Sequence, residues 1–397
     1  MTDITVASAQ VDAFEGYEEL AARFRPLFAQ IGEGVRDREA SGTPPQEQLQ
    51  ALIAHGFAGL RVPVEHGGGG IRLVQILRLI AELAEADPNL AHIWRNHLSF
   101  IEDRLHDPDD PRSADWLRRL GAGEVVGGGW SEPAAPGVVD TQTTITEEHG
   151  IRRLTGRKLY STGSIYATWS TVLAYDPAGE KVVALIPTDA EGVTIGDDWD
   201  GFGQRLTGSG SVTYDRVRVP DNAEFVYAER YRYQEQFYQS TLNALLVGIG
   251  RAVIRDGLEA FRARVRSHRR ASTQTLSEDP QLLEVFGRLF IAHRTLEAQF
   301  LESLRQLDTV AETDYPAESD LERSWLDTTV TQVTAGETVL DAATKVLDVL
   351  GSSGTSSRFA LDRHWRNART IVSHNPRIYK HRFVGDWLVN GVSPTAV

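Results

Sequence analysis

The spacing of apolar residues changes twice along this chain of 397 residues, and this change limits the possible folds more than any other feature. From about Gly16 to Gly121, and again from about Tyr231 to the end, apolar residues recur at the spacing of amphipathic helices. Between about Val125 and Phe225 they alternate with polar residues, as in strands. The sequence therefore predicts a β-region between two helical regions.

Individual helices and strands are predicted from these patterns of apolar residues and from the residue types at their ends. His55-Gly56 is typical of a helix end, and Asp279-Pro280 of a helix start. Strands are predicted at 170–175 and 181–187, joined by a turn at 176–179, and again at 211–214 and 217–220. Long helices are predicted over 234–268, 280–307 and 320–350. Two shorter helical stripes comprise Leu73, Ile76, Leu77, Ile80, Leu83 and Ala84, and then Leu90, Ile93, Trp94, His97, Leu98 and Ile101.

The predicted fold is α+β. We expect an N-terminal helical domain over residues 1–124, a small central β-barrel domain over 125–226 and a C-terminal four-helix bundle over 227–397. Domain junctions are preferred places for cofactors. A binding cleft is therefore expected where the β-domain meets the helical domains.

Composition excludes several classes of function. The net charge of −14 argues against nucleic-acid binding. The absence of cysteine removes disulfides, thiol nucleophiles and metal–thiolate sites, and no HExxH zinc helix is present, so no metal site is expected. No stretch approaches the roughly 20 apolar residues that span a membrane, and the N-terminus lacks a secretory pattern. We expect a cytoplasmic protein with neither membrane nor nucleic-acid partners.

Glycine-rich stretches do not form a recognisable nucleotide site. Gly248-Ile249-Gly250 lies in a helical stretch and lacks the third glycine of a dinucleotide fingerprint, and Leu206 replaces that glycine after 201–203. The run 67–70 lacks the Lys-Ser/Thr of a phosphate-binding loop. The sequence therefore predicts no site for a nicotinamide cofactor or ATP.

Four longer stretches carry a specific resemblance. They are Gly127–Pro133, Gly156–Gly163, Asp198–Gly210, and Asp362–Thr370 continuing into Ser373–Pro376. With the helical, β, helical layout, the first two resemble the acyl-CoA dehydrogenase superfamily over nearly the whole chain. The last two resemble its flavin-dependent monooxygenase branch, which includes the dibenzothiophene and dimethylsulfone monooxygenases. The resemblance implies flavin chemistry and a homotetramer built through the C-terminal bundle.

The chain departs from the dehydrogenases where they hold a carboxylate base. Asn375 stands where one group of the family has Glu, and residues 241–243, which match the other position, contain no carboxylate. Amides and hydroxyls cannot remove the proton next to a thioester carbonyl. An acyl-CoA or acyl-carrier dehydrogenase is therefore the weaker alternative, beside a non-catalytic flavin-binding scaffold.

The resemblance also implies roles for single residues. His374 is expected to be catalytic, since a histidine that titrates near neutrality can donate a proton to an oxygen adduct of the flavin; the alternative is a structural histidine before Pro376. Other expected catalytic residues are Ser161, Asn96 and His97, although His97 also lies on an apolar stripe. Expected flavin-binding residues are Trp130, Ser131, Tyr160 and Ser161, and expected substrate-lining residues are Trp94, Arg95 and Tyr238.

Two further regions bear on the cofactor. Arg269 or Arg270 is expected to bind the flavin phosphate, and Ser352 and Ser353 lie in a loop that in the family meets the flavin of a neighbouring subunit. Dehydrogenases have Gln and a Gly pair near this loop for the adenine half of FAD. Their absence here favours FMN over FAD.

These expectations combine into one function. A separate flavin reductase supplies diffusible FMNH2, and O2 then reacts at the flavin C4a carbon to form a hydroperoxide. That adduct oxygenates a small apolar organosulfur or nitrogen-containing substrate. The cofactor supplies the oxidising chemistry, while the protein binds, orients and shields it.

Overall fold

The computed structural model describes residues 16–133, 140–264 and 270–393. Its first region is helical, and none of the described helices is long and apolar enough to cross a membrane. The region contains α1 (Tyr17–Glu33), α2 (Val35–Ser41), α3 (Gln46–Ala54), the 3-10 turn η1 (Val64–His66), α4 (Leu73–Ala86), α5 (Pro88–Leu105) and α6 (Pro111–Gly121).

The middle region forms one mixed sheet of eight strands. The strand order is β6-β7-β3-β2-β4-β5-β8, and β1 pairs in parallel with β4. The strands are β1 (Val126–Gly128), β2 (Thr144–Glu148), β3 (Ile151–Lys158), β4 (Trp169–Tyr175), β5 (Lys181–Pro187), β6 (Val193–Ile195), β7 (Val212–Arg218) and β8 (Glu224–Val226), with turns η2 (Ser164–Tyr166) and η3 (Tyr227–Glu229).

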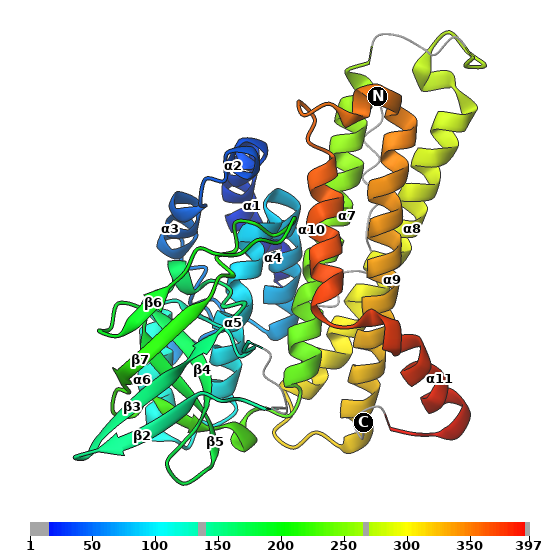
Figure 1. Cartoon of the computed structure of the whole chain (residues 1–397). Helices are drawn as coiled ribbons and strands as arrows, with labels where there is room; N and C mark the ends of the chain where they lie inside the picture. Colours follow the sequence, from blue (N-terminus) through cyan, green and yellow to red (C-terminus); the bar gives the residue numbers. More distant parts are fainter. Residues whose placement is uncertain (1–15, 134–139, 265–269, 394–397) are drawn as a thin grey trace.

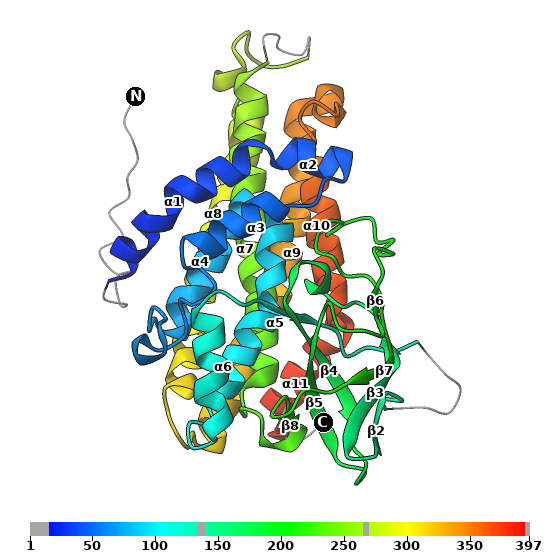
Figure 2. The ribbon, with the colours of Figure 1, turned by 90° about the vertical axis from the view of Figure 1, so that its left-hand side faces the viewer.

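The last region is helical again and is built from long helices. These are α7 (Gln234–Arg262), α8 (Pro280–Ala311), α9 (Glu318–Leu350), α10 (Asp362–His374) and α11 (Lys380–Asn390), with the 3-10 turns η4 (Leu276–Glu278), η5 (Gly351–Thr355) and η6 (Arg377–Tyr379). Helices α7 to α10 stand side by side as a bundle, whereas α11 projects from its lower end (Figure 1). In Figure 1, α4 and α5 lie between this bundle and the sheet, and in Figure 2 they lie in front of the bundle.

The predicted order of helical and β regions is confirmed, with two differences. The sheet follows an open path, and no described residues pair β6 with β8, so it is a mixed sheet rather than a closed barrel. It still curls around its own apolar core, which includes Leu154, Val172 and Tyr214. The strands expected at 211–214 and 217–220 are one continuous strand, β7, because its residues pair with β3 through a local register shift.

Helix starts repeat one device. Asp87, Asp110 and Asp279 each precede a proline, and their side chains accept hydrogen bonds from backbone N–H groups of the first turn of α5, α6 and α8. The carboxylate satisfies N–H groups that have no partner inside the helix, and proline needs no such partner at the first position. The start predicted at Asp279-Pro280 is confirmed. The first long helix ends at Arg262, before the expected residue 268.

Helix α7 is the central support of the molecule. A Cβ atom added at Gly248 would lie 2.4 Å from the carbonyl oxygen of Ala81 in α4, and one at Gly250 would lie 2.5 Å from the ring of His293 in α8. Glycine is therefore required at both positions for the helices to pack this closely. The Gly248-Ile249-Gly250 stretch serves helix packing, in agreement with its rejection as a nucleotide motif.

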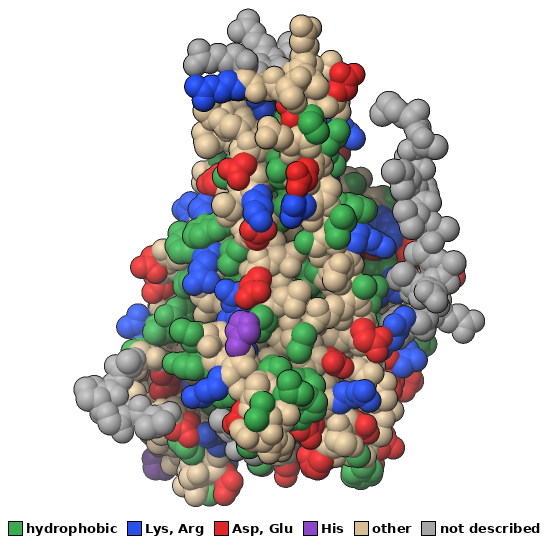
Figure 3. All heavy atoms as spheres, turned by 90° about the vertical axis from the view of Figure 1, so that its right-hand side faces the viewer, with side chains coloured by type: hydrophobic (Ala, Val, Ile, Leu, Met, Phe, Trp, Pro, Cys, Tyr) green, Lys and Arg blue, Asp and Glu red, His purple; other side chains and the backbone are tan. Residues whose placement is uncertain are grey.

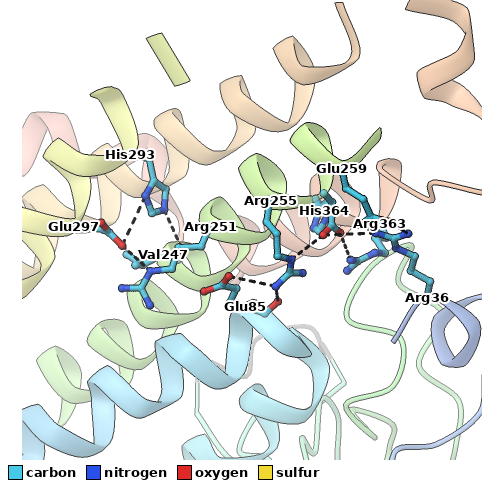
Figure 4. A network of polar contacts seen from close by, with 11 residues as sticks. Arg36, Glu85, Val247, Arg251, Arg255, Glu259, His293, Glu297, Arg363 and His364 are labelled. Carbon is cyan, nitrogen blue, oxygen red and sulfur yellow. Dashed lines mark hydrogen bonds and ion pairs between the residues drawn. The ribbon is translucent and has the colours of Figure 1, made fainter. Parts of the chain in front are cut away.

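A buried ionic network joins α7 to α10 and to the N-terminal helices (Figure 4). Asp256 accepts from Arg363 at 2.6 Å and from His364 at 2.9 Å, and Arg255 and Arg36 also contact it. The Asp256 and Arg363 side chains are each only 2% exposed. The cationic partners and the hydrogen bonds hold the pKa of Asp256 well below its ordinary value despite burial.

We expect Asp256→Asn to lower the free energy of unfolding by about 3–5 kcal/mol, because it leaves the buried Arg363 charge without its partner. Glu259→Gln is the matched control: Glu259 pairs with Arg36 at the surface, and its loss should cost no more than about 1 kcal/mol. Urea unfolding followed by circular dichroism measures both. Equal losses in the two variants would contradict the assignment of Asp256 as the centre of the network.

Candidate active site

One large cavity lies where the three regions meet. Its volume is about 910 Å³, within the range of small-molecule sites. The cavity walls are formed by helix α5, the β-region loops around Trp130 and Gln204, the start of α7, the first half of α9 and the α10–α11 junction. This is the domain junction at which the sequence predicted a site.

One face of α5 points into the cavity. His92, Arg95 and Asn96 line it, and their spacing of three and four residues places them on the same side of the helix. Asn96 anchors the adjacent β-region by donating from Nδ2 to the carbonyl oxygen of Gly128 at 2.6 Å. Two of the expected residues, Arg95 and Asn96, are thus cavity residues.

Trp94 and His97 occupy the opposite side of α5, and neither lines the cavity. Both are fully buried. His97 Nε2 lies 2.8 Å from the carbonyl oxygen of Ala58, and the backbone N–H of Val126 donates to its Nδ1. Burial lowers the pKa of His97 to about 4, so it is neutral at physiological pH. The expected catalytic and substrate-lining roles of these two residues do not fit their positions, which are packing positions.

His374 ends α10 and faces Arg95 across the cavity. The guanidinium Nη1 of Arg95 lies 2.7 Å from His374 Nε2, and Asn375 Oδ1 lies 3.3 Å from His374 Nδ1. The Arg95 charge, and then burial, lower the pKa of His374 to about 3. An arginine only donates, so Nε2 is the acceptor and Nδ1 carries the proton. The expectation that His374 titrates near neutrality is therefore wrong for this state of the protein.

A chain of carboxamides continues from His374 into the bundle. Asn375 Nδ2 donates to Gln239 Oε1 at 2.7 Å, Gln239 Nε2 to Asn243 Oδ1 at 2.9 Å, and Asn243 Nδ2 to the carbonyl oxygen of Thr328 at 3.1 Å. Every amide donates in the same direction, away from the histidine. Asn375 therefore presents its oxygen to His374, which holds the ring in the Nδ1–H tautomer.

His92 is a cavity residue that the sequence interpretation missed. Its Nδ1 lies 2.9 Å from Gln204 Oε1, and its ring centroid lies 6.4 Å from that of His374. Burial, and then the charge of Arg95, lower the pKa of His92 to about 3. Buried atoms without a protein partner include His92 Nε2, Gln204 Nε2 and Gln332 Oε1. The sequence contained one signal for His92: it precedes Arg95 by three residues, so the two lie on the same side of a helix.

The β-region forms a wall with a glycine backbone and aromatic side chains. Gly128, Trp130, Ser131 and Tyr160 line the cavity there, as expected for the last three. Tyr160 has a positive φ of 56°, and its ring packs edge-on against Trp199 at 5.8 Å.

Ser161 differs from its expected role. It is 1% exposed and does not line the cavity, and its hydroxyl accepts from the Ser164 hydroxyl at 3.2 Å inside the β-region. Its side chain is therefore not part of the cavity wall in this structure.

An aromatic cluster closes the side of the cavity near the start of α7. The ring of Trp130 lies 5.9 Å from that of Tyr227 and 6.0 Å from that of Tyr238. Ser99 donates to the Tyr238 hydroxyl at 2.7 Å, and Arg230 lies 4.6 Å from the Trp130 ring. The expected position of Tyr238 at the cavity wall agrees with this arrangement.

Comparison with known proteins agrees with this geometry. The acyl-CoA dehydrogenase N-terminal domain matches residues 16–124, and the acyl-CoA dehydrogenase C-terminal domain matches residues 240–376. This chain belongs to the acyl-CoA dehydrogenase superfamily.

Individual relatives lie in the monooxygenase branch of that superfamily. A Pseudomonas putida protein named "Probable FMNH2-dependent monooxygenase SfnC" is 26% identical, with 93% of this chain and 94% of the relative covered. Dibenzothiophene monooxygenase of Mycolicibacterium goodii is 28% identical, with 90% of each covered. The FMN-bound structure of TdsC from Paenibacillus sp. A11-2 superposes with a TM-score of 0.89 at 27% identity, covering 96% of this chain and 99% of TdsC.

Membership of the superfamily relates the carboxamide chain to the positions of the dehydrogenase base. Asn375 and the stretch 241–243 match the two positions where dehydrogenases of the superfamily hold their base, and here Asn375 and Asn243 are two links of the chain that orients His374. Thr241 is buried, and its hydroxyl donates to the backbone oxygen of Phe237. Neither position can remove a proton from a thioester.

The residues present fit a flavin of this superfamily. The aromatic wall would shield a flat ring, and the unpartnered nitrogens of His92 and Gln204 offer hydrogen bonds to its polar edge. A ring system with apolar faces and a polar rim matches this combination.

The expected phosphate-binding residues are not part of this cavity. Ser352 and Ser353 lie in η5, before α10, whereas His374 is at the other end of that helix, about 20 Å away by its length. Arg270 lies in the loop before α8, and Arg269 falls outside the described residues. Their expected role in flavin binding therefore stays a prediction.

We expect Arg95→Gln to raise the pKa of His374 by at least about one unit from its value near 3, because the first cause of its depression is the Arg95 charge. NMR titration of protein carrying 13C-labelled histidine measures this, with the His374→Gln variant assigning the signal. His97 is the internal control, since burial alone lowers its pKa. A His374 signal that already titrates near neutrality in the unmodified protein would contradict the Arg95 contact.

Proposed function

We infer that this protein is a two-component flavin-dependent monooxygenase, which uses reduced FMN and O2 to oxygenate a small organosulfur or nitrogen-containing substrate. The observation that carries this inference is the pair of neutral histidines, His92 and His374, beside Arg95 in a cavity with no carboxylate at the dehydrogenase base positions. Among the described residues that line the cavity, Glu235 is the one that carries a carboxylate, and it is exposed. The relatives named above support the same class of reaction.

Bound FMN would lie against the wall formed by Gly128 to Ser131 and Tyr160, with His92 and Gln204 at its polar edge. Reduced FMN supplies the electrons with which O2 is cleaved, one oxygen atom entering the substrate and the other leaving as water. The aromatic side chains exclude bulk water, which otherwise favours loss of the oxidising equivalents. His374 Nε2, which accepts from Arg95 in this structure, would receive or relay a proton once that contact is released.

The substrate space is proposed to be the aromatic pocket of Trp130, Tyr227 and Tyr238. Flat apolar molecules gain from stacking and from burial against such rings. Dibenzothiophene, named for one relative, belongs to this class. This supports a small molecule with an apolar body and a soft sulfur or nitrogen atom.

A flavin reductase is the proposed partner. No stretch of the sequence forms a nicotinamide fingerprint, and one relative is named for its dependence on FMNH2. Reduced flavin would therefore arrive by diffusion from a second protein.

We also propose a homotetramer assembled through the C-terminal bundle. The exposed side of α8 carries Leu283, Phe290 and Ile291, which are 51%, 53% and 66% exposed. Hydrophobic side chains lie among charged ones on the face of the molecule shown in Figure 3. A seven-residue spacing on one helix side is typical of helix–helix interfaces, and assembly would bring Ser352, Ser353 and Arg270 of one copy toward another copy's cavity.

With a reductase, NADH and FMN, the protein is expected to oxygenate aromatic sulfides and release little hydrogen peroxide. His374→Ala should lower product formation about 100-fold or more, since positioned acid–base groups contribute this much, and should raise peroxide release. His381→Ala is the control, because His381 is 67% exposed on α11 and does not line the cavity. Product is measured by chromatography and peroxide by a coupled assay. Peroxide without product, or anaerobic bleaching of bound flavin by acyl thioesters, would favour the alternatives.

Light scattering after gel filtration is expected to give four times the mass of the chain. The double substitution Leu283→Glu and Phe290→Glu should shift the protein to smaller species, because like charges would face each other in a symmetric interface. Arg288→Gln is the matched control on the same helix, where Arg288 is exposed and pairs with Glu284. A monomeric mass for the unmodified protein would contradict the proposal.

A further inference from the structure

Arg95 is a cation that no carboxylate neutralises within the described residues. Other buried arginines are paired: Arg230 lies 2.9 Å from Asp103, and Arg363 lies 2.6 Å from Asp256. Among the described residues no carboxylate pairs with Arg95, and its guanidinium contacts the neutral ring of His374. Arg95 is half-buried at the cavity wall, with its Nε buried, and desolvation lowers its pKa. A cation in this position without a counter-charge is costly.

Arg95 lines the cavity and has hydrogen-bond donors beyond the one that contacts His374. The guanidinium carries five N–H groups, and its Nε is buried without a partner. The group also lies 4.8 Å from the centre of the Tyr238 ring, so it borders the aromatic pocket. The site thus places a planar cation with free donors next to a surface that fits an apolar ring.

We propose that Arg95 binds the oxyanionic group of the substrate, so that the substrate is a small sulfinate with an apolar body, which gains one oxygen atom at sulfur and leaves as the sulfonate. This rests on the proposed monooxygenase function and narrows its substrate class. The apolar body would lie against Trp130, Tyr227 and Tyr238, and two oxygens of the anion would accept from the fork of Arg95, a pairing that favours planar bidentate contact.

A second cation, Lys380, lines the cavity, but it does not lack a counter-charge as Arg95 does. Lys380 lies 4.8 Å from the centre of the Trp325 ring, and the Glu235 carboxylate is close enough to act on its charge. Lys380 therefore has a counter-charge, whereas Arg95 has none. The two residues also lie on different elements, α11 and α5. A Lys380 variant is accordingly the matched control.

Binding anions at Arg95 would also change His374. The ligand would compete for the donor that now contacts His374 Nε2 and would offset the positive charge that keeps this ring neutral. His374 would become easier to protonate only when the anion is present. Substrate binding would thus prepare the histidine for proton transfer.

The test measures equilibrium binding by calorimetry to the intact protein loaded with oxidised FMN. The probes are benzenesulfinate and methyl phenyl sulfone, which share a ring and an oxidised sulfur but differ in charge. Benzenesulfinate is expected to bind at least about tenfold more tightly than the sulfone, since hydrogen bonds to charged groups are worth about 1.5–3 kcal/mol. Arg95→Gln should abolish this preference, Arg95→Lys should keep part of it, and Lys380→Gln should leave it intact.

Three outcomes would overturn the proposal: equal binding of the two probes by the unmodified protein, an unchanged preference in Arg95→Gln, or loss of the preference in Lys380→Gln instead. Reduced FMN also carries negative charge that Arg95 could bind. Its affinity for the protein is therefore measured anaerobically as well. If Arg95→Gln weakens reduced FMN but not benzenesulfinate, Arg95 serves the flavin and the proposal fails. Because the binding test involves no turnover, its failure is distinct from failure of the oxygenation assay.

Discussion

The close packing of α4 and α8 on α7 is the constraint on which the rest of the structure depends. Gly248 and Gly250 allow it, because any side chain at either position would meet the neighbouring helix. With α4 fixed on α7, α5 also packs on the bundle and carries His92, Arg95 and Asn96 to the cavity. The geometry of the candidate site is thus set by a helix contact outside it.

The hydrogen bonds of the carboxamide chain at the cavity all run from donor to acceptor in one direction, away from His374. The carboxamides end at the carbonyl oxygen of Thr328, a fixed acceptor, so each amide has to donate toward it. The consequence at the other end is that His374 keeps Nε2 free of a proton and in contact with Arg95. Replacement of a carboxylate by Asn375 therefore does more than remove a dehydrogenase base: it provides the oxygen that orients the catalytic candidate.

Much of the fold was predictable because periodicity and helix ends are local signals. The order of regions, the start at Asp279-Pro280 and the hairpin of β4 and β5 follow from short stretches. The open sheet was not predictable, because closure depends on pairing between strands far apart. On α5 the expected residues 94–97 formed one consecutive run, but a helix turns consecutive residues to different sides, so Trp94 and His97 pack inward while Arg95 and Asn96 reach the cavity.

The sequence by itself determined the class of the protein: the layout and the four matching stretches place it in the acyl-CoA dehydrogenase superfamily, and the missing carboxylates indicate its monooxygenase branch. Only the tertiary structure decided what individual polar residues do. It brought His92 and His374 to one cavity, gave the Ser161 hydroxyl a partner inside the β-region and left Arg95 without a carboxylate partner among the described residues. The physical reason is that a residue's charge state and accessibility depend on neighbours that are distant in sequence, and no local pattern records them.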